Sequence, residues 1–199
     1  GSQIQVLKNE KVLEDFIVGR FSFNQQNRSA TSFIRLNGQD EVYAVDGFMA
    51  MTLAQGFDSY RNKELLRLAP EMEITEFSFQ SRDTSLNFLL QDGQWLLNGQ
   101  IALDSAKVSN YLNDLKTLNG STFADDFDDV QSADLRFKTL IAKGNNILNP
   151  IQINWYRDTT RENPFVLQSN YNNEVYFASD SSGVYQRVFK DVSDFLPEQ

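Results

Sequence analysis

The chain has 199 residues, of which 41% are hydrophobic and 13% aromatic, and its formal net charge is −9. This composition excludes a disordered tail, and an acidic balance without a basic patch argues against nucleic acid and anionic membrane surfaces as ligands. With no cysteine and no histidine, disulfides, cysteine-ligated zinc, thiol nucleophiles and histidine bases are excluded as well.

The first third of the chain predicts antiparallel strands followed by a helix. Residues 4–7 and 12–18 form two strand patterns, and residues 31–36 are linked to 41–45 by Asn37-Gly38. Both residues of that dipeptide tolerate positive φ, so it is a strong hairpin signal. The apolar spacing of Phe48, Met51 and Leu53 predicts a helix over residues 47–55.

The middle of the chain contains the clearest helix pattern. Strands are expected at 74–80, 86–90 and 95–97, and the helix at 105–118. Asp104 or Ser105 can cap its first turn. The helix has one apolar stripe at helical spacing, formed by Val108, Tyr111, Leu112, Leu115 and Leu118.

The last third repeats the strand pattern and ends in another helix. Strands are expected at 135–141, 151–156, 165–168 and 174–178, and the helix at 184–196, where Pro197 stops it.

Two segments of the chain resemble each other and predict a duplication. Residues 41–44, Glu-Val-Tyr-Ala, and 174–177, Glu-Val-Tyr-Phe, are each preceded by a strand and followed by an aspartate and a helical stretch. We therefore expect an α+β fold in which antiparallel sheets and helices form duplicated units. The expected units are residues 1–70, 71–130 and 131–199, packed as one compact domain or as two intimately packed halves.

The sequence contains no phosphate-binding glycine loop and no nucleophile elbow, so no catalytic residue is predicted. Residues 82–85 and 157–160 carry Asp-Thr pairs that resemble an aspartic dyad, but both are expected to be ordinary turns. The acidic run at 125–129 is expected to be a solvated loop rather than a calcium site, because it lacks a central glycine and a distal glutamate.

A ligand or partner surface is the only kind of site that the residues suggest. Trp95 and Trp155 are candidates for stacking against a sugar, although a core position is favoured for strand aromatics. Tyr60, Arg61 and Lys63 form a small basic spot that suits an acidic partner, with a solvated helix face as the preferred alternative. Neither a cofactor-binding nor a metal-binding residue is predicted.

Two segments carry a resemblance to a known family. Residues 41–48, Glu-Val-Tyr-Ala-Val-Asp-Gly-Phe, and 60–66, Tyr-Arg-Asn-Lys-Glu-Leu-Leu, resemble the bacterial family called domain of unknown function 4340. The middle of the chain, with Asp-Gly-Gln-Trp at 92–95 and the helix at 105–118, is similar to the other half of that family's repeat. The chain departs from the pattern where Tyr60 replaces a phenylalanine, and it begins inside a unit, as if an earlier half-unit and anchor were missing.

The resemblance implies an extracytoplasmic domain, in the periplasm or cell envelope, behind an N-terminal membrane helix. It also implies an association with ABC-type transport systems, and it brings no catalytic residues. We therefore expect a non-enzymatic accessory or protein-interaction module without a cofactor, which does not itself insert into the membrane. The alternatives are a glycan- or peptide-binding module and, third, a hydrolase that uses carboxylates.

Overall fold

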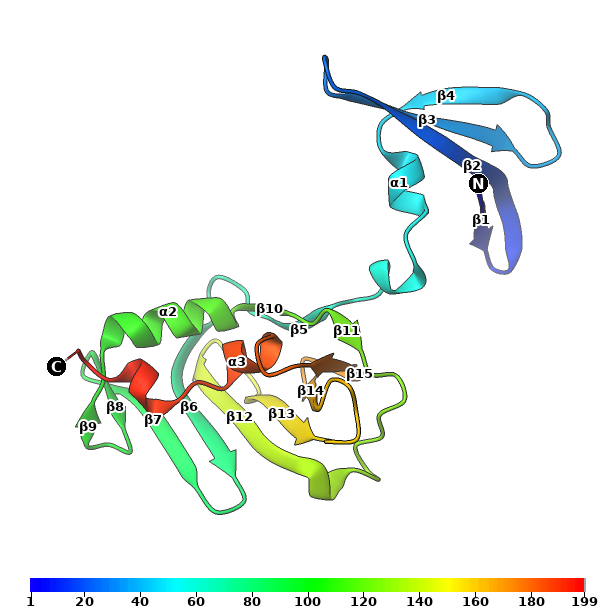
Figure 1. Ribbon diagram of the computed structural model, residues 1–199. Helices are drawn as coiled ribbons and strands as arrows, with labels where there is room; N and C mark the ends of the chain where they lie inside the picture. Colours follow the sequence, from blue (N-terminus) through cyan, green and yellow to red (C-terminus); the bar gives the residue numbers. More distant parts are fainter. Residues whose placement is uncertain (199) are drawn as a thin grey trace. The chain divides into compact units, whose positions relative to one another are not determined.

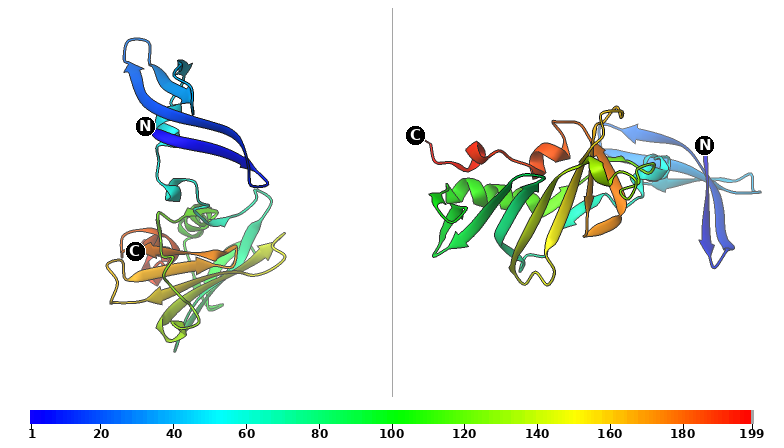
Figure 2. Two further views of the ribbon diagram at one scale, coloured as in Figure 1. Left: turned by 90° about the vertical axis from the view of Figure 1, so that its right-hand side faces the viewer. Right: turned by 90° about the horizontal axis from the view of Figure 1, so that it is seen from below.

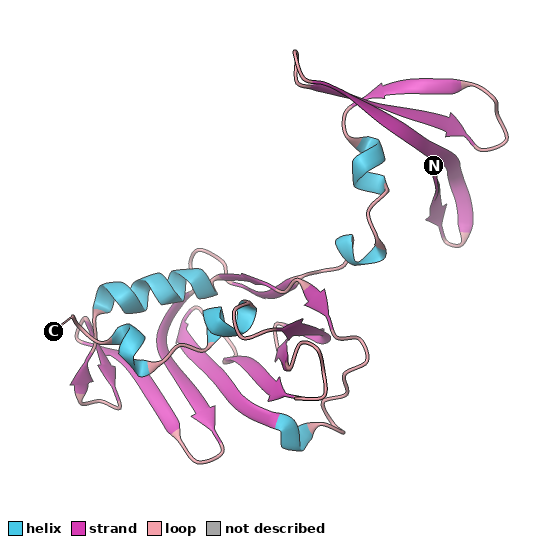
Figure 3. Ribbon diagram, in the orientation of Figure 1, coloured by secondary structure: helices cyan, strands magenta, loops and turns pink. Residues whose placement is uncertain are grey.

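The computed structural model describes residues 1–198, which divide into two compact units: unit 1, residues 1–61, and unit 2, from residue 62 onward. Strands hold 48% of the residues and helices 16%, a difference that Figure 3 makes plain. The expected antiparallel sheets with accompanying helices are confirmed. The fold is nevertheless mainly β rather than α+β, because all three predicted helices are shorter than the sequence pattern indicates.

Unit 1 is a four-stranded antiparallel meander followed by short helical turns (Figure 1). Its elements are β1 (Ser2–Lys8), β2 (Lys11–Asn24), β3 (Ser29–Leu36), β4 (Val42–Asp46), α1 (Met49–Leu53) and the 3-10 turn η1 (Phe57–Ser59). The predicted Asn37-Gly38 turn joins β3 to β4, with Gly38 at φ 79°. The strand predicted at 12–18 continues to Asn24 through an irregularity after Val18.

The helix predicted at 47–55 forms only over α1, and its predicted apolar side is not buried. Phe48 and Met51 are exposed, whereas Ala50 is buried. The reason is the attachment of α1 to the sheet: the Ala50 backbone N–H donates to Ser32 Oγ at 2.9 Å, which turns Ala50 inward. A helix of five residues covers one end of the sheet only.

Unit 2 contains a nine-stranded antiparallel sheet in the order β11-β15-β14-β13-β12-β6-β7-β8-β9, and a two-stranded ladder of β5 and β10. Its strands are β5 (Glu64–Arg67), β6 (Glu73–Ser81), β7 (Ser85–Gln91), β8 (Gln94–Leu97), β9 (Ile101–Ala102), β10 (Thr117–Asn119), β11 (Thr122–Phe123), β12 (Arg136–Asn145), β13 (Ile151–Arg157), β14 (Phe165–Ser169) and β15 (Asn172–Ser179). Its helical elements are α2 (Ser105–Leu115), α3 (Val184–Val188), η2 (Ala133–Leu135) and η3 (Val192–Phe195).

The main core of unit 2 lies between one face of this sheet and the segments α2, α3 and η3, which lie on the same side of it in Figures 1 and 2. Its centre is aromatic: Phe77 stacks on Phe88 with ring centroids 4.3 Å apart, and Phe195 approaches Phe88 at 5.2 Å. Rings in such a core contribute large buried areas and specific edge and stacking contacts. A smaller cluster on the other face includes Phe127, Tyr156 and Val166.

The predicted helix at 105–118 is confirmed as α2, three residues shorter. Asp104 caps it by accepting from the N–H groups of Ala106 and Lys107, and its apolar stripe is buried. The helix predicted at 184–196 is instead split into α3 and η3. Asp191 starts a new turn through a capping box with Asp194, so a single helix does not continue through this point.

The boundaries between the units differ from the predicted ones. The structure divides after Arg61, and the segments predicted as a second and a third unit share one sheet through β6 and β12. Among residues 1–198 no helix has the length and apolar character needed to cross a bilayer.

Candidate functional site

The two tryptophans named as candidates for a stacking surface lie in the core of unit 2, so the favoured core position is confirmed and the surface alternative is wrong. Trp95 and Trp155 are each only 4% exposed. The Trp155 ring packs 4.2 Å from Tyr185 and 5.1 Å from Phe165, measured between ring centroids. On strands β8 and β13 these residues alternate onto the face that the helices cover, so neither ring can stack against a sugar.

The residues of the basic spot fall in different units: Tyr60 and Arg61 belong to unit 1, and Lys63 belongs to unit 2. Tyr60 is exposed, and its hydroxyl donates to the Thr52 carbonyl at 2.6 Å. Arg61 pairs with Asp58 at 3.1 Å. The Lys63 carbonyl accepts from the Gly120 N–H at 2.9 Å within unit 2.

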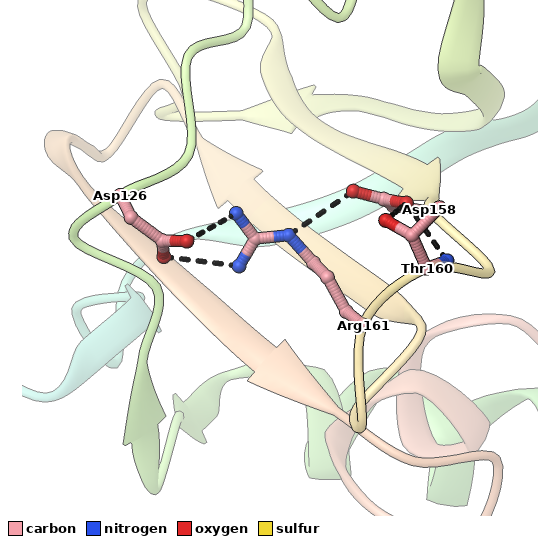
Figure 4. A network of polar contacts seen from close by, with 4 residues as sticks. All are labelled: Asp126, Asp158, Thr160 and Arg161. Atoms are coloured by element: carbon pink, nitrogen blue, oxygen red, sulfur yellow. Dashed lines mark hydrogen bonds and ion pairs between the residues drawn. The ribbon is translucent and has the colours of Figure 1, made fainter.

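The aspartates of the two Asp-Thr segments lie in turns after β6 and β13, as the sequence predicted. Asp83 lies in the exposed turn between β6 and β7. Asp158 accepts from the Thr160 N–H and hydroxyl at 3.0 and 2.6 Å, as Figure 4 shows. These hydrogen bonds, with the nearby Arg161, lower the pKa of Asp158. A general acid needs a raised carboxyl pKa, whereas the pKa of Asp158 is lowered.

Arg161 ties the acidic loop to the rest of unit 2 (Figure 4). Its guanidinium contacts Asp126 at two positions, 3.0 and 2.8 Å, and its Nε donates to Asp158 at 3.2 Å. The hydrogen bonds from Arg161 lower the pKa of Asp126. The same guanidinium lies 5.4 Å from the Phe127 ring centroid, above the smaller core cluster. The acidic loop is therefore anchored by an ion-pair network.

The other aspartates of this loop are also used locally. Asp128 accepts from the N–H groups of Val130 and Gln131 at 2.9 and 3.0 Å. Burial and the hydrogen bond to Asp129 raise the pKa of Tyr176 to about 12. Within residues 1–198, no group of three or more acidic side chains is placed to hold a metal ion.

The feature of unit 1 that stands out is an apolar sheet face with little cover. Cross-strand pairs place their side chains on the same face, and this face of the sheet also carries α1. We call it the helix-side face; its apolar members include Ile4, Val6, Phe16, Val18, Phe21, Phe23, Ile34 and Leu36. The fully buried apolar residues of unit 1 are limited to Val18, Ala30 and Ala50.

An aromatic trio marks the most open part of the helix-side face. The Phe48 ring lies 6.2 Å from Phe21 and 6.0 Å from Phe23, measured between centroids. All three rings are exposed, between 37% and 48%. Clustered exposed aromatics differ from single exposed apolar residues, because they mark surfaces that other molecules cover.

The edges of the unit 1 sheet are also open. Within residues 1–61, β1 pairs only with β2 and β4 only with β3, so each presents unpaired backbone groups along its outer side. Sequence reasoning missed this surface. The exposed pairs Val12-Leu13 and Phe21-Phe23 interrupt the alternation of apolar and polar residues along β2. That interruption is the sequence signal that could have indicated the exposed apolar face.

The comparisons with known proteins give one match. A family model described as a domain of unknown function, DUF4340, matches residues 3–138. Neither the curated proteins nor the solved structures contain a match.

Proposed function

This chain belongs to the family described as domain of unknown function DUF4340, and we propose that it is a non-enzymatic module that binds a protein partner in the cell envelope. The observation that carries the proposal is the helix-side face of unit 1. A sheet with one apolar face is stable in water only when that face is packed against something. Here α1 covers one end, and the aromatic trio stays exposed.

The order of strands and helices along the chain supports a partner that supplies both a strand and a helix to unit 1. We propose that the strand sets β1–β4, β6–β9 and β12–β15, each followed by a helix, are copies of one unit. In unit 2 two of these sets join through their first strands, β6 and β12. In unit 1 the corresponding strand, β1, is an edge. A partner that adds a strand along β1 and lays a helix on the helix-side face would complete unit 1 in the same way.

The location of the module is proposed from the family resemblance. Family members are extracytoplasmic domains held by an N-terminal membrane helix and often accompany ABC-type transport systems. We therefore propose the periplasm or cell envelope as the location, a natural N-terminal anchor, and an accessory role beside a transporter.

A peptide ligand is the second candidate, favoured by the open edges of β1 and β4. An extended peptide can add to such an edge through backbone hydrogen bonds. It would need no helix and would leave the aromatic trio exposed, which distinguishes it from a folded partner.

The test is an affinity capture from a bacterial envelope extract with three baits. Wild type is compared with Phe23→Lys, which places a charge in the aromatic trio, and with Leu148→Lys. Leu148 is 96% exposed on the hairpin between β12 and β13, so its change is the matched control. We expect a partner that binds wild type and Leu148→Lys and is reduced at least about tenfold on Phe23→Lys, or about 1.4 kcal/mol. Equal recovery on all three baits would contradict the proposed surface.

A further inference from the structure

The large sheet of unit 2 has an approximate two-fold arrangement about the junction of β6 and β12. Outward from this junction, β7, β8 and β9 follow β6 on one side, and β13, β14 and β15 follow β12 on the other. The register shows the same symmetry: Ser78, the sixth residue of β6, lies opposite Ile141, the sixth residue of β12. Two antiparallel strands that meet at equivalent positions are related by a two-fold axis.

Unit 1 contains one half of such an arrangement. Its strands follow the order β1-β2-β3-β4 with antiparallel pairing throughout, and α1 comes after β4. The strand that corresponds to β6 and β12 is β1, because it is the first of its set. Within residues 1–61, β1 is paired along one side only, so the sheet of unit 1 ends where the sheet of unit 2 continues through its junction.

The outer side of β1 is regular along the whole strand. The register irregularity lies where Val6 faces Glu14 and Leu7 faces Val12, so the additional residue belongs to β2 and β1 has no bulge. β1 contains no proline and no acidic residue, and Lys8, at its end, is its only charged residue. The usual features that protect an edge strand are therefore missing from its centre.

The sequence of β1 is complementary to itself in an antiparallel pair. With Gln5, its middle residue, on a two-fold axis, Ile4 lies opposite Val6 of a second copy, and Ser2 lies opposite Lys8. The first pair joins the helix-side faces of both copies through apolar side chains, and the second brings no like charges together. An axis at Val6 would instead place Ile4 opposite Lys8, so the register centred on Gln5 is favoured.

The residues that flank the axis position differ in exposure between the two units. In unit 1 Val6 is 44% exposed and Ile4 is half-buried. In unit 2 the flanking residues are apolar and at most 6% exposed: Phe77 and Phe79 on β6, and Leu140 and Ala142 on β12. This difference is expected if the junction of unit 2 forms within one chain and that of unit 1 forms between two chains.

We propose that unit 1 pairs with unit 1 of a second copy of this chain through β1, antiparallel and centred on Gln5, to form an eight-stranded sheet. This inference rests on the proposed function, because it names the molecule that supplies a strand, β1, and a helix, α1. The aromatic trio lies beyond the part of β2 that β1 covers, residues 11–18, so it stays available to another protein.

A cysteine placed on the axis tests this geometry. The chain has no cysteine, so an introduced thiol is the only one in each copy. In Gln5→Cys the two thiols face each other across an antiparallel pair, whose Cα spacing of about 4.5–5.5 Å a disulfide can span. We expect mild oxidation to give a cross-linked dimer. Ala44→Cys, at the middle of the other edge strand, β4, is the matched control and should cross-link at least tenfold less.

A mixing experiment tests the register. Gln3 of one copy lies opposite Leu7 of the other, whereas two copies of Gln3 lie about 13 Å apart along the strands. Gln3→Cys and Leu7→Cys chains of different tag length are therefore oxidised together and separated on a non-reducing gel. We expect the mixed dimer to exceed either self-linked dimer at least fivefold.

Sedimentation equilibrium measures the association without a cross-link. We expect the wild-type chain to dimerise reversibly at micromolar concentration. Val6→Lys places a charge opposite Ile4 of the second copy and should weaken the dimer at least tenfold. The exposure of Val6 in the single chain predicts that this variant keeps its fold, as circular dichroism can confirm. Leu148→Lys adds the same charge to unit 2 and should dimerise as wild type does.

Three results would overturn the inference: a chain that stays monomeric up to millimolar concentration, equal cross-linking of Ala44→Cys and Gln5→Cys, or undiminished dimerisation of Val6→Lys. Failure of the proposed function gives different results. A monomeric chain that still captures an envelope protein through the aromatic trio overturns only the second copy. A dimer linked at Gln5→Cys that captures no envelope protein supports the second copy and contradicts a different partner.

Discussion

Unit 1 and unit 2 are built from the same kind of antiparallel meander but differ in how completely it is covered. In unit 2 the eleven residues of α2, together with α3 and η3, cover the apolar face, and Phe77, Phe88 and Leu140 are at most 1% exposed. In unit 1 the five residues of α1 leave aromatic rings exposed. The four strands and short helix of unit 1 do not make a complete core, whereas the larger sheet and helical segments of unit 2 do.

The sheet edges show the same contrast. The nine-stranded sheet of unit 2 ends in β9 and β11, each two residues long. The sheet of unit 1 ends in β1 and β4, which have seven and five residues. Short edge strands are a common protection against unwanted pairing. The short edge strands of unit 2 therefore limit the addition of another strand, whereas the longer edge strands of unit 1 allow it.

The largest expected effect is a core truncation in unit 2. Phe77→Ala removes a ring that contacts Phe88, Trp95 and Tyr111, and we expect it to lower the free energy of unfolding by about 3–5 kcal/mol. Phe21→Ala in unit 1 is the matched variant and should cost less than about 1 kcal/mol, because that ring is already 37% exposed. Urea unfolding of both variants checks this, and equal costs would show that unit 1 has a core as complete as that of unit 2.

A smaller effect concerns the acid sensitivity of unit 2. Because the folded state lowers the pKa of Asp126 and Asp158, their stabilising contribution is complete above the unfolded pKa of about 4 and is lost as the pH falls below it. Arg161→Met removes the main cause of the Asp126 shift but leaves the Thr160 hydrogen bonds to Asp158. We expect the Asp126 pKa to rise towards 3.8, measured by NMR titration, and stability to fall less steeply between pH 4 and pH 2.

The control for this prediction is salt. Asp126 is 77% exposed, so salt should screen its pairing with Arg161 and reduce the difference between wild type and Arg161→Met. An unchanged Asp126 pKa in the variant would mean that Arg161 does not cause the shift.

The smallest expected effect is on the surface of unit 1. Phe57 is 79% exposed, so Phe57→Ser should change the free energy of unfolding by less than about 0.5 kcal/mol. Thermal unfolding of the purified chain measures this directly. A large loss of stability would show that the ring is covered in solution, as expected if unit 1 is occupied by another molecule.

Local patterns were sufficient where one face of an element is buried and its ends are capped. α2 was predictable because its apolar stripe and the cap at Asp104 agree, although it ends at Leu115, before the predicted Asn119-Gly120 stop. The hairpin at Asn37-Gly38 was predictable because its turn chemistry is local. Where packing between distant segments decides, the sequence was insufficient: the pairing of β6 with β12 has no local signal.

The candidate site was less predictable than the fold. Trp95 and Trp155 were named because of their ring type, but exposure depends on which face of a strand the helices cover.

The position of Phe195 has a consequence for synthesis on the ribosome. This ring is 1% exposed and packs between Phe88 and Tyr111, and its carbonyl accepts from the Asp104 N–H at 2.9 Å. While Phe195 is still inside the ribosome, the aromatic centre of unit 2 is open to water. Unit 2 therefore reaches its native packing only after Phe195 has left the ribosome, whereas the contacts within unit 1 involve no residue beyond Arg61.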